Sequence, residues 1–77
     1  MNKSRRAQLS RAFSMLNDVA STIEAVLDDE RDALGNMPEN LEDSERVQSM
    51  ENAVDCLEEA IDNVQEATTN VQEAINC

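Results

Sequence analysis

The chain has 77 residues, and its 17 acidic and six basic residues leave a formal net charge of −11. A chain of this length is at most one domain and seldom buries enough apolar surface to be stable without a disulfide, a metal ion or a partner chain. Phe13 is the only aromatic residue and histidine is absent, which disfavours a large globular core, an aromatic ligand cage, base-stacking platforms and a zinc site.

Cys56 and Cys77 are 21 residues apart. On one straight helix they would be roughly 30 Å apart, too far for a disulfide with each other. The sequence therefore predicts two reduced thiols, no metal and no cofactor.

No apolar run is long enough to span a bilayer, and the basic residues 1–6 are not followed by the apolar segment of a signal peptide. We therefore expect a cytoplasmic protein without membrane contacts.

The first predicted element is a helix over residues 4–34. Apolar residues recur there at alternating steps of three and four, as one face of a helix requires. The main column contains Leu9, Ala12, Leu16, Val19, Ile23, Val26 and Ala33. A second column beside it contains Phe13, Ala20, Leu27 and Leu34. Glu30 interrupts the apolar face near the end of the helix, where we expect its carboxylate to reach solvent.

A loop is predicted over residues 35–43. Gly35 suits the left-handed position that closes many helices, and Pro38 cannot continue a helix. Residues 38–41 have room for one short turn. We expect Met37 and Leu41 to cover the apolar end of the resulting hairpin.

The second predicted helix covers residues 44–76, with Asp43 or Ser44 as its N-cap. Its apolar residues follow the a and d positions of successive heptads: Val47, Met50, Val54, Leu57, Ile61, Val64, Thr68, Val71 and Ile75. For Thr68, a hydroxyl bonded to the Val64 carbonyl is the favoured interpretation, and a polar layer that sets the register of a dimer is the alternative.

Alanines occupy one further heptad position, directly before each a residue: Ala53, Ala60, Ala67 and Ala74. Three apolar positions per heptad form a wider stripe than a two-stranded seam needs. The predicted fold is therefore all-α: a two-helix antiparallel hairpin, similar to a coiled coil, that dimerises into a four-helix bundle. The residues predicted to form the oligomer seam are Val54, Leu57, Ile61, Val64, Val71 and Ile75.

The charges are unevenly distributed, because Arg31 and Arg46 are the only bases after Arg11. We expect the basic residues 3–11 to lie beside the carbonyl end of the second helix. We expect the carboxylates of residues 51–66 to lack cations and so to resemble a phosphate backbone to a basic protein. The candidate partner-binding residues are Glu51, Asp55, Glu58, Glu59, Asp62 and Glu66.

Solubility with intramolecular complementarity is the competing explanation of these acids. In either case the charge disfavours direct binding to nucleic acid or to an anionic membrane.

No catalytic pattern is present. An EF-hand loop counted from Asp28 would have Ala33 at the position where the turn requires glycine. The adjacent carboxylates of Glu58 and Glu59 are expected on an exposed helix face, without the apolar surroundings that would shift the pKa of a catalytic acid or base. The sequence predicts a protein that is not an enzyme.

Residues 36–46, NMPENLEDSER, and residues 53–67, AVDCLEEAIDNVQEA, carry a resemblance. They resemble small acidic helical-hairpin proteins of unknown function encoded in phages and mobile elements of Gram-positive, often gut, bacteria. The resemblance implies a bacterial host cell, where small acidic proteins often block host defence by occupying a nucleic-acid site. It suggests an inhibitor of a host defence or DNA-handling protein that binds a basic or nucleic-acid-binding partner. The alternative is a structural or adaptor module that oligomerises through its apolar seam.

Overall fold

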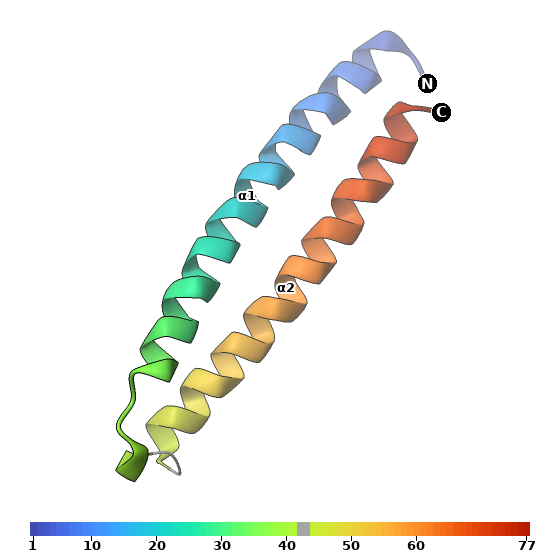
Figure 1. The fold of residues 1–77 in the computed structure, drawn as a ribbon. Coiled ribbons are helices and arrows are strands. Elements are labelled where there is room, and N and C mark those ends of the chain that lie inside the picture. The colour runs from blue at the N-terminus through green and yellow to red at the C-terminus, as the bar shows by residue number, and fades with distance from the viewer. Residues whose placement is uncertain (42–43) are drawn as a thin grey trace.

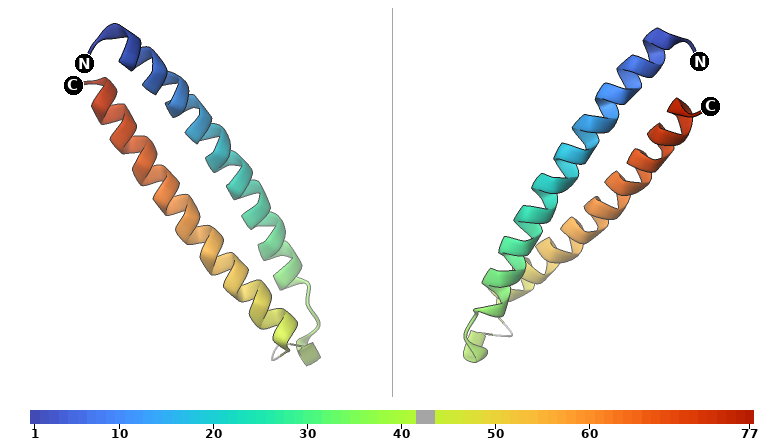
Figure 2. Two further views of the ribbon diagram at one scale, coloured as in Figure 1. Left: turned by 180° about the vertical axis from the view of Figure 1, so that it is seen from behind. Right: turned by 45° about the horizontal axis from the view of Figure 1, so that its top comes forward.

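The computed structural model describes residues 1–41 and 44–77 and shows two long helices packed against each other (Figure 1). Helix α1 spans Lys3–Gly35, the short 3-10 helix η1 spans Glu39–Leu41, and α2 spans Glu45–Ile75. No strand occurs among the described residues. The helices run antiparallel, with both termini at one end and the loop at the other (Figure 2). The predicted all-α hairpin is confirmed.

The end of α1 differs from the prediction. Gly35 lies inside the helix, and no described residue, glycine included, has a positive φ. The C-cap is Asn36, at φ −95° and ψ 2°. Its N–H donates to the Asp32 carbonyl (3.1 Å) and the Ala33 carbonyl (3.3 Å). A tightened, right-handed last turn thus satisfies the terminal carbonyls, so the left-handed residue predicted at Gly35 is not needed.

Both helix starts are capped by side chains. Asn2 Oδ1 accepts a hydrogen bond of 2.8 Å from the Arg5 N–H, and Ser44 Oγ accepts one of 3.2 Å from the Val47 N–H. Ser44 is therefore the N-cap of α2. The other candidate, Asp43, and the predicted cover by the Leu41 side chain lie outside the described part of the chain. Met37 is half-buried, in keeping with its predicted place at the end of the hairpin.

The best-packed part of the hairpin lies in its loop-proximal half. Leu27, Val54 and Ile61 form a buried cluster. The partly buried Ile23, Leu34 and Leu57 pack against this cluster. Among the described residues, none before Leu27 on α1 and none after Ile61 on α2 is buried. The half of the hairpin near the termini is therefore held by half-exposed contacts.

The face that α1 turns toward α2 is rotated from the predicted one. Val19 and Val26, from the predicted main column, are 47% and 49% exposed. The second column takes their place, since Leu27 is buried and Phe13 and Ala20 are half-buried. The residues of α1 that form the seam are Leu9, Phe13, Leu16, Ala20, Ile23, Leu27, Glu30 and Leu34. Both columns satisfy the helical spacing, and turning the larger Phe13 and Leu27 inward buries more apolar area.

The seam of α2 lies where the heptads predict. Its nine a and d residues are all buried or half-buried, and Ala53, Ala60, Ala67 and Ala74 beside them are half-buried. The Thr68 hydroxyl donates to the Val64 carbonyl at 2.7 Å, which confirms the favoured interpretation of this residue. Three residues of the predicted oligomer seam, Val54, Leu57 and Ile61, pack in the cluster around Leu27 of α1 within one hairpin.

Candidate functional site

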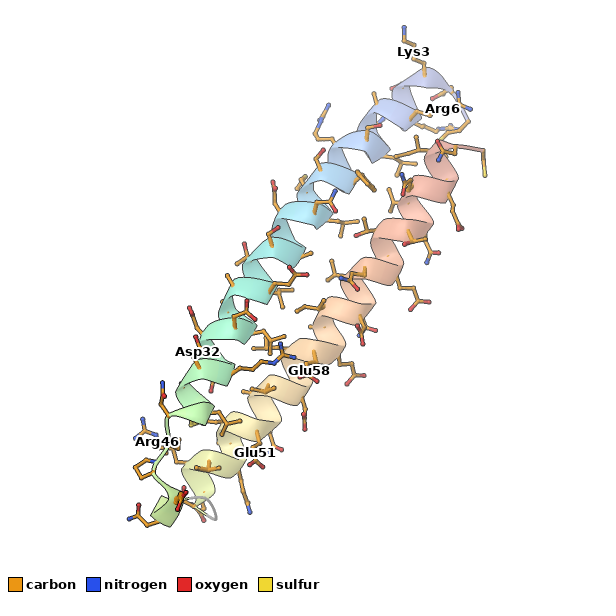
Figure 3. All side chains as sticks on the ribbon, viewed as in Figure 1. Lys3, Arg6, Asp32, Arg46, Glu51 and Glu58 are labelled. Atoms are coloured by element: carbon orange, nitrogen blue, oxygen red, sulfur yellow. The ribbon has the colours of Figure 1, made fainter. Side chains whose placement is uncertain are left out.

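The acidic face, defined as Glu51, Asp55, Glu58, Glu59, Asp62 and Glu66, lies along the solvent-exposed surface of α2, and two of its members, Glu58 and Asp62, border the groove between the helices. All six residues are exposed. Glu51 and Glu58 mark its course along α2 in Figure 3. Because the helix rises 1.5 Å per residue, six carboxylates are spread over about 22 Å, or one per roughly 4 Å. One strand of DNA carries a charge about every 3.4 Å, so the acidic face approaches the charge density of a single strand.

One cation reaches the acidic face from α1. Arg31 Nη2 donates to Glu58 Oε1 at 2.6 Å, and Arg31 Nη1 lies 3.9 Å from Asp28 Oδ1. No other ion pair occurs among the described residues. The expectation that this stretch lacks cations is therefore wrong at Glu58. Arg31 is 27 residues away in the chain, so only the packing of the helices brings it there.

The Arg31–Glu58 pair crosses an open groove between the helices. Four carboxylates and one guanidinium surround this groove, whose floor is apolar. The lining residues are Glu24, Leu27, Asp28, Arg31, Glu58, Ile61 and Asp62. The carboxylates of Glu24 and Asp28 thus extend the acidic surface onto α1, which the sequence analysis missed. The sequence would have indicated this extension only if the second apolar column, which contains Leu27, had been chosen as the face toward α2. That choice places Glu24 and Arg31 opposite Glu58.

Fewer acidic residues line this side of the hairpin toward the termini. A second open groove there is lined by polar and small residues, with Glu24 at its loop-proximal end: Asn17, Ala20, Ser21, Glu24, Gln65, Thr68 and Thr69. At the far end, Arg6 Nη2 donates to the Cys77 carbonyl at 2.7 Å. Figure 3 shows Arg6 beside the end of α2, whereas Lys3 points away from it. The predicted placement of basic residues beside the carbonyl end of α2 is therefore confirmed for Arg6 but not for Lys3.

The acidic side of the hairpin is open to solvent. Its carboxylates are exposed and its groove is open, so nothing desolvates a group for acid or base catalysis. Within residues 1–41 and 44–77, no group of three His, Cys, Asp or Glu residues is placed to hold a metal ion. Cys56 and Cys77 are free and exposed. Neither helix of the described chain has a segment long and apolar enough to cross a membrane.

Fold and surface together define a small acidic helical hairpin with one strongly anionic side. Comparison of the chain with protein-family models, with curated proteins and with solved structures found no match.

Proposed function

We propose that this chain is a non-enzymatic protein-binding module whose acidic face occupies the cationic, nucleic-acid-binding surface of another protein. The observation that carries the proposal is the imbalance of charge on this side of the hairpin. Of the six carboxylates of the acidic face, only that of Glu58 has an ion-pair partner among the described residues. Glu24 and Asp28 add two more carboxylates from α1.

The physical basis of this binding is electrostatic. An anionic rod attracts a basic protein at long range and speeds the encounter, whereas nucleic acid and anionic membranes are repelled. Contacts between such exposed charges are screened beyond about 8 Å at physiological salt. The affinity should therefore fall steeply as salt is added. In the setting that the resemblance of residues 36–46 and 53–67 implies, the module is a phage-type inhibitor of a host defence or DNA-handling protein in the bacterial cytoplasm.

Charge reversal tests the acidic face directly. The test variant carries Asp55→Lys, Glu59→Lys and Asp62→Lys, all at exposed positions. The matched control reverses three exposed acids outside the acidic face, Asp18, Asp32 and Glu73. Both variants change the net charge equally, so a difference between them reports the place of the charge.

The readout is capture from a host lysate with the purified protein as bait, eluted first with competitor DNA and then with salt. The captured protein is then titrated with each variant at several salt concentrations. We expect DNA to release one nucleic-acid-binding protein, and the test variant to bind it at least tenfold more weakly than the control. Equal binding of the two variants would reject the proposal.

A second candidate function, a structural or adaptor module, is favoured by a different observation. Met15, Val19 and Val26 of α1 are large apolar side chains left 61%, 47% and 49% exposed by the hairpin. An oligomerisation module would use such residues to pair hairpins into the proposed homodimeric four-helix bundle. In that case charge reversal on the acidic face would have no effect on function, and Val19→Glu would abolish it.

A further inference from the structure

The side of the hairpin opposite to the acidic groove is nearly free of acids. Arg31 and Glu58 each directly follow a seam residue, and their contact shows that such positions of the two helices meet on one side. Positions directly before a seam residue must then share the other side. We call the alanines and valines at these positions the acid-poor face: Ala12, Val19, Val26 and Ala33 on α1, and Ala53, Ala60, Ala67 and Ala74 on α2.

The residues flanking the acid-poor face have the same character. On α1 they include Met15, Thr22 and Asp29, and on α2 Cys56 and Asn63. Asp29 is the one carboxylate on this side within the described helices. Three of the exposed large apolar side chains of the described chain lie here: Met15, Val19 and Val26. Ala12, Met15, Leu16 and Val19 line a shallow apolar groove in this side.

The hairpin exposes more surface than a compact chain of its mass. Its accessible area is 5711 Å² at 8.6 kDa. A compact monomeric protein of that mass exposes about 4,700 Å², roughly 1,000 Å² less. A stable interface covers about 800 Å² on each partner. The excess is therefore of the size that one interface along the hairpin would bury.

Charge identifies a second copy of the chain as a suitable occupant. Two chains of net charge −11 repel each other, and the acid-poor face is the side through which they can meet without bringing rows of carboxylates together. A cationic partner gains nothing there, because its attraction is to the opposite side. The face is also self-complementary in size, since its valines lie on α1 and α2 offers only alanines.

The distribution of large and small residues sets the orientation of the two copies. A twofold axis along the helices puts both loops at the same end and each α1 over the other copy's α2, so that Val19 and Val26 meet the alanine column. A twofold axis across the helices puts the loops at opposite ends and stacks valines on valines and alanines on alanines. Facing large and small side chains pack more densely than like on like.

We infer that two copies of this chain bind through the acid-poor face with both loops at the same end, each α1 packed against the other copy's α2. This gives the proposed homodimer a defined interface and does not depend on the acidic-face function. The two acidic faces then point outward on opposite sides of the bundle. The assembly is thereby bivalent toward a basic partner.

Light scattering of the purified protein tests the pairing. Two chains of 8.6 kDa give about 17 kDa. Val26→Glu should convert this dimer to a helical monomer. Ala25→Glu is the matched control, because Ala25 is exposed and adjacent in sequence but points away from the acid-poor face. A monomeric parent protein, or a Val26→Glu variant that stays as dimeric as the control, would overturn the inference.

Disulfide trapping tests the orientation in a Cys56→Ser, Cys77→Ser background. Chains carrying Val19→Cys alone and chains carrying Ala67→Cys alone are unfolded, mixed, refolded and oxidised. This mixture should yield a crosslinked heterodimer, whereas a mixture of Val19→Cys and Val26→Cys chains should not. The opposite result would place the loops at opposite ends and refute the proposed packing.

Salt separates this inference from the acidic-face proposal. Screening weakens the repulsion between two anionic chains, so added salt should leave the dimer intact or tighten it. The same salt should release a basic partner. If the chain is monomeric at all salt concentrations yet binds its basic partner, only the dimer is refuted. If the chain is a dimer, but charge reversal on the acidic face changes no binding and no salt-sensitive partner is found, only the acidic-face function is refuted.

Discussion

Arg31 on α1 and Glu58 on α2 form the only hydrogen bond between side chains of the two helices within the described chain, at 2.6 Å. The bond lies on the acidic side of the hairpin, beside the best-packed part of the core, where Leu27 and Ile61 form the groove floor. It shows which sides of α1 and α2 meet, and it neutralises one carboxylate of the acidic face.

Arg31→Gln should destabilise the hairpin slightly. The two side chains are 49% and 47% exposed, and exposed ion pairs contribute about 0.2 to 1 kcal/mol. In a domain of this size that corresponds to a fall in Tm of roughly 1 to 8 °C. Thermal melts followed by circular dichroism should show the fall at low salt and a smaller one near 1 M salt. The control is Arg11→Gln, because Arg11 is exposed and has no ion pair in the described chain. An equal fall in Tm in both variants would show that the Arg31–Glu58 pair contributes nothing to stability.

Leu27→Ala should largely unfold the hairpin. Leu27 is 4% exposed at the centre of the buried cluster, and truncating a buried leucine costs about 2 to 5 kcal/mol. Leu9→Ala, at a half-buried seam residue near the termini, should cost clearly less. Urea unfolding of both variants measures the difference. Equal losses would contradict a core concentrated in the loop-proximal half.

Thr68→Val should stabilise the hairpin by up to about 1 kcal/mol, because a methyl group replaces a hydroxyl at a half-buried seam position. The hydroxyl bonds only to the Val64 carbonyl of its own helix, and losing such a bond leaves no buried donor unpaired. Thr69→Val at the adjacent exposed position is the control and should leave Tm nearly unchanged. Destabilisation by Thr68→Val alone would indicate that the hydroxyl has a further role in the seam.

Ser44→Ala should cost about 1 kcal/mol, since its hydroxyl caps the first turn of α2 and alanine offers no acceptor for the Val47 N–H. Ser49→Ala, at an exposed position inside α2, should be neutral or slightly stabilising because alanine favours the helix interior. The free energies of unfolding from urea titrations make the comparison. A Ser44→Ala variant as stable as the Ser49→Ala variant would show that the cap is dispensable.

The sequence by itself determined the secondary structure of this protein. Alternating steps of three and four residues predicted both helices, Pro38 placed the break between them, and Ser44 could be identified as a possible cap. These features are local, because each depends on residues within one or two turns of the same helix. The seam of α2 was equally predictable, since its heptads leave one continuous apolar column with alanines beside it.

Only the tertiary structure decided how α1 is rotated. Leu27 and Val26 belong to neighbouring columns with the same spacing, so periodicity could not tell which column faces α2. That rotation brings Arg31 to Glu58, places Glu24 and Asp28 on the acidic side, and leaves Val19 and Val26 exposed. The physical reason is that spacing within one helix records which residues share a face, whereas the choice between adjacent faces depends on the side chains that the other helix presents.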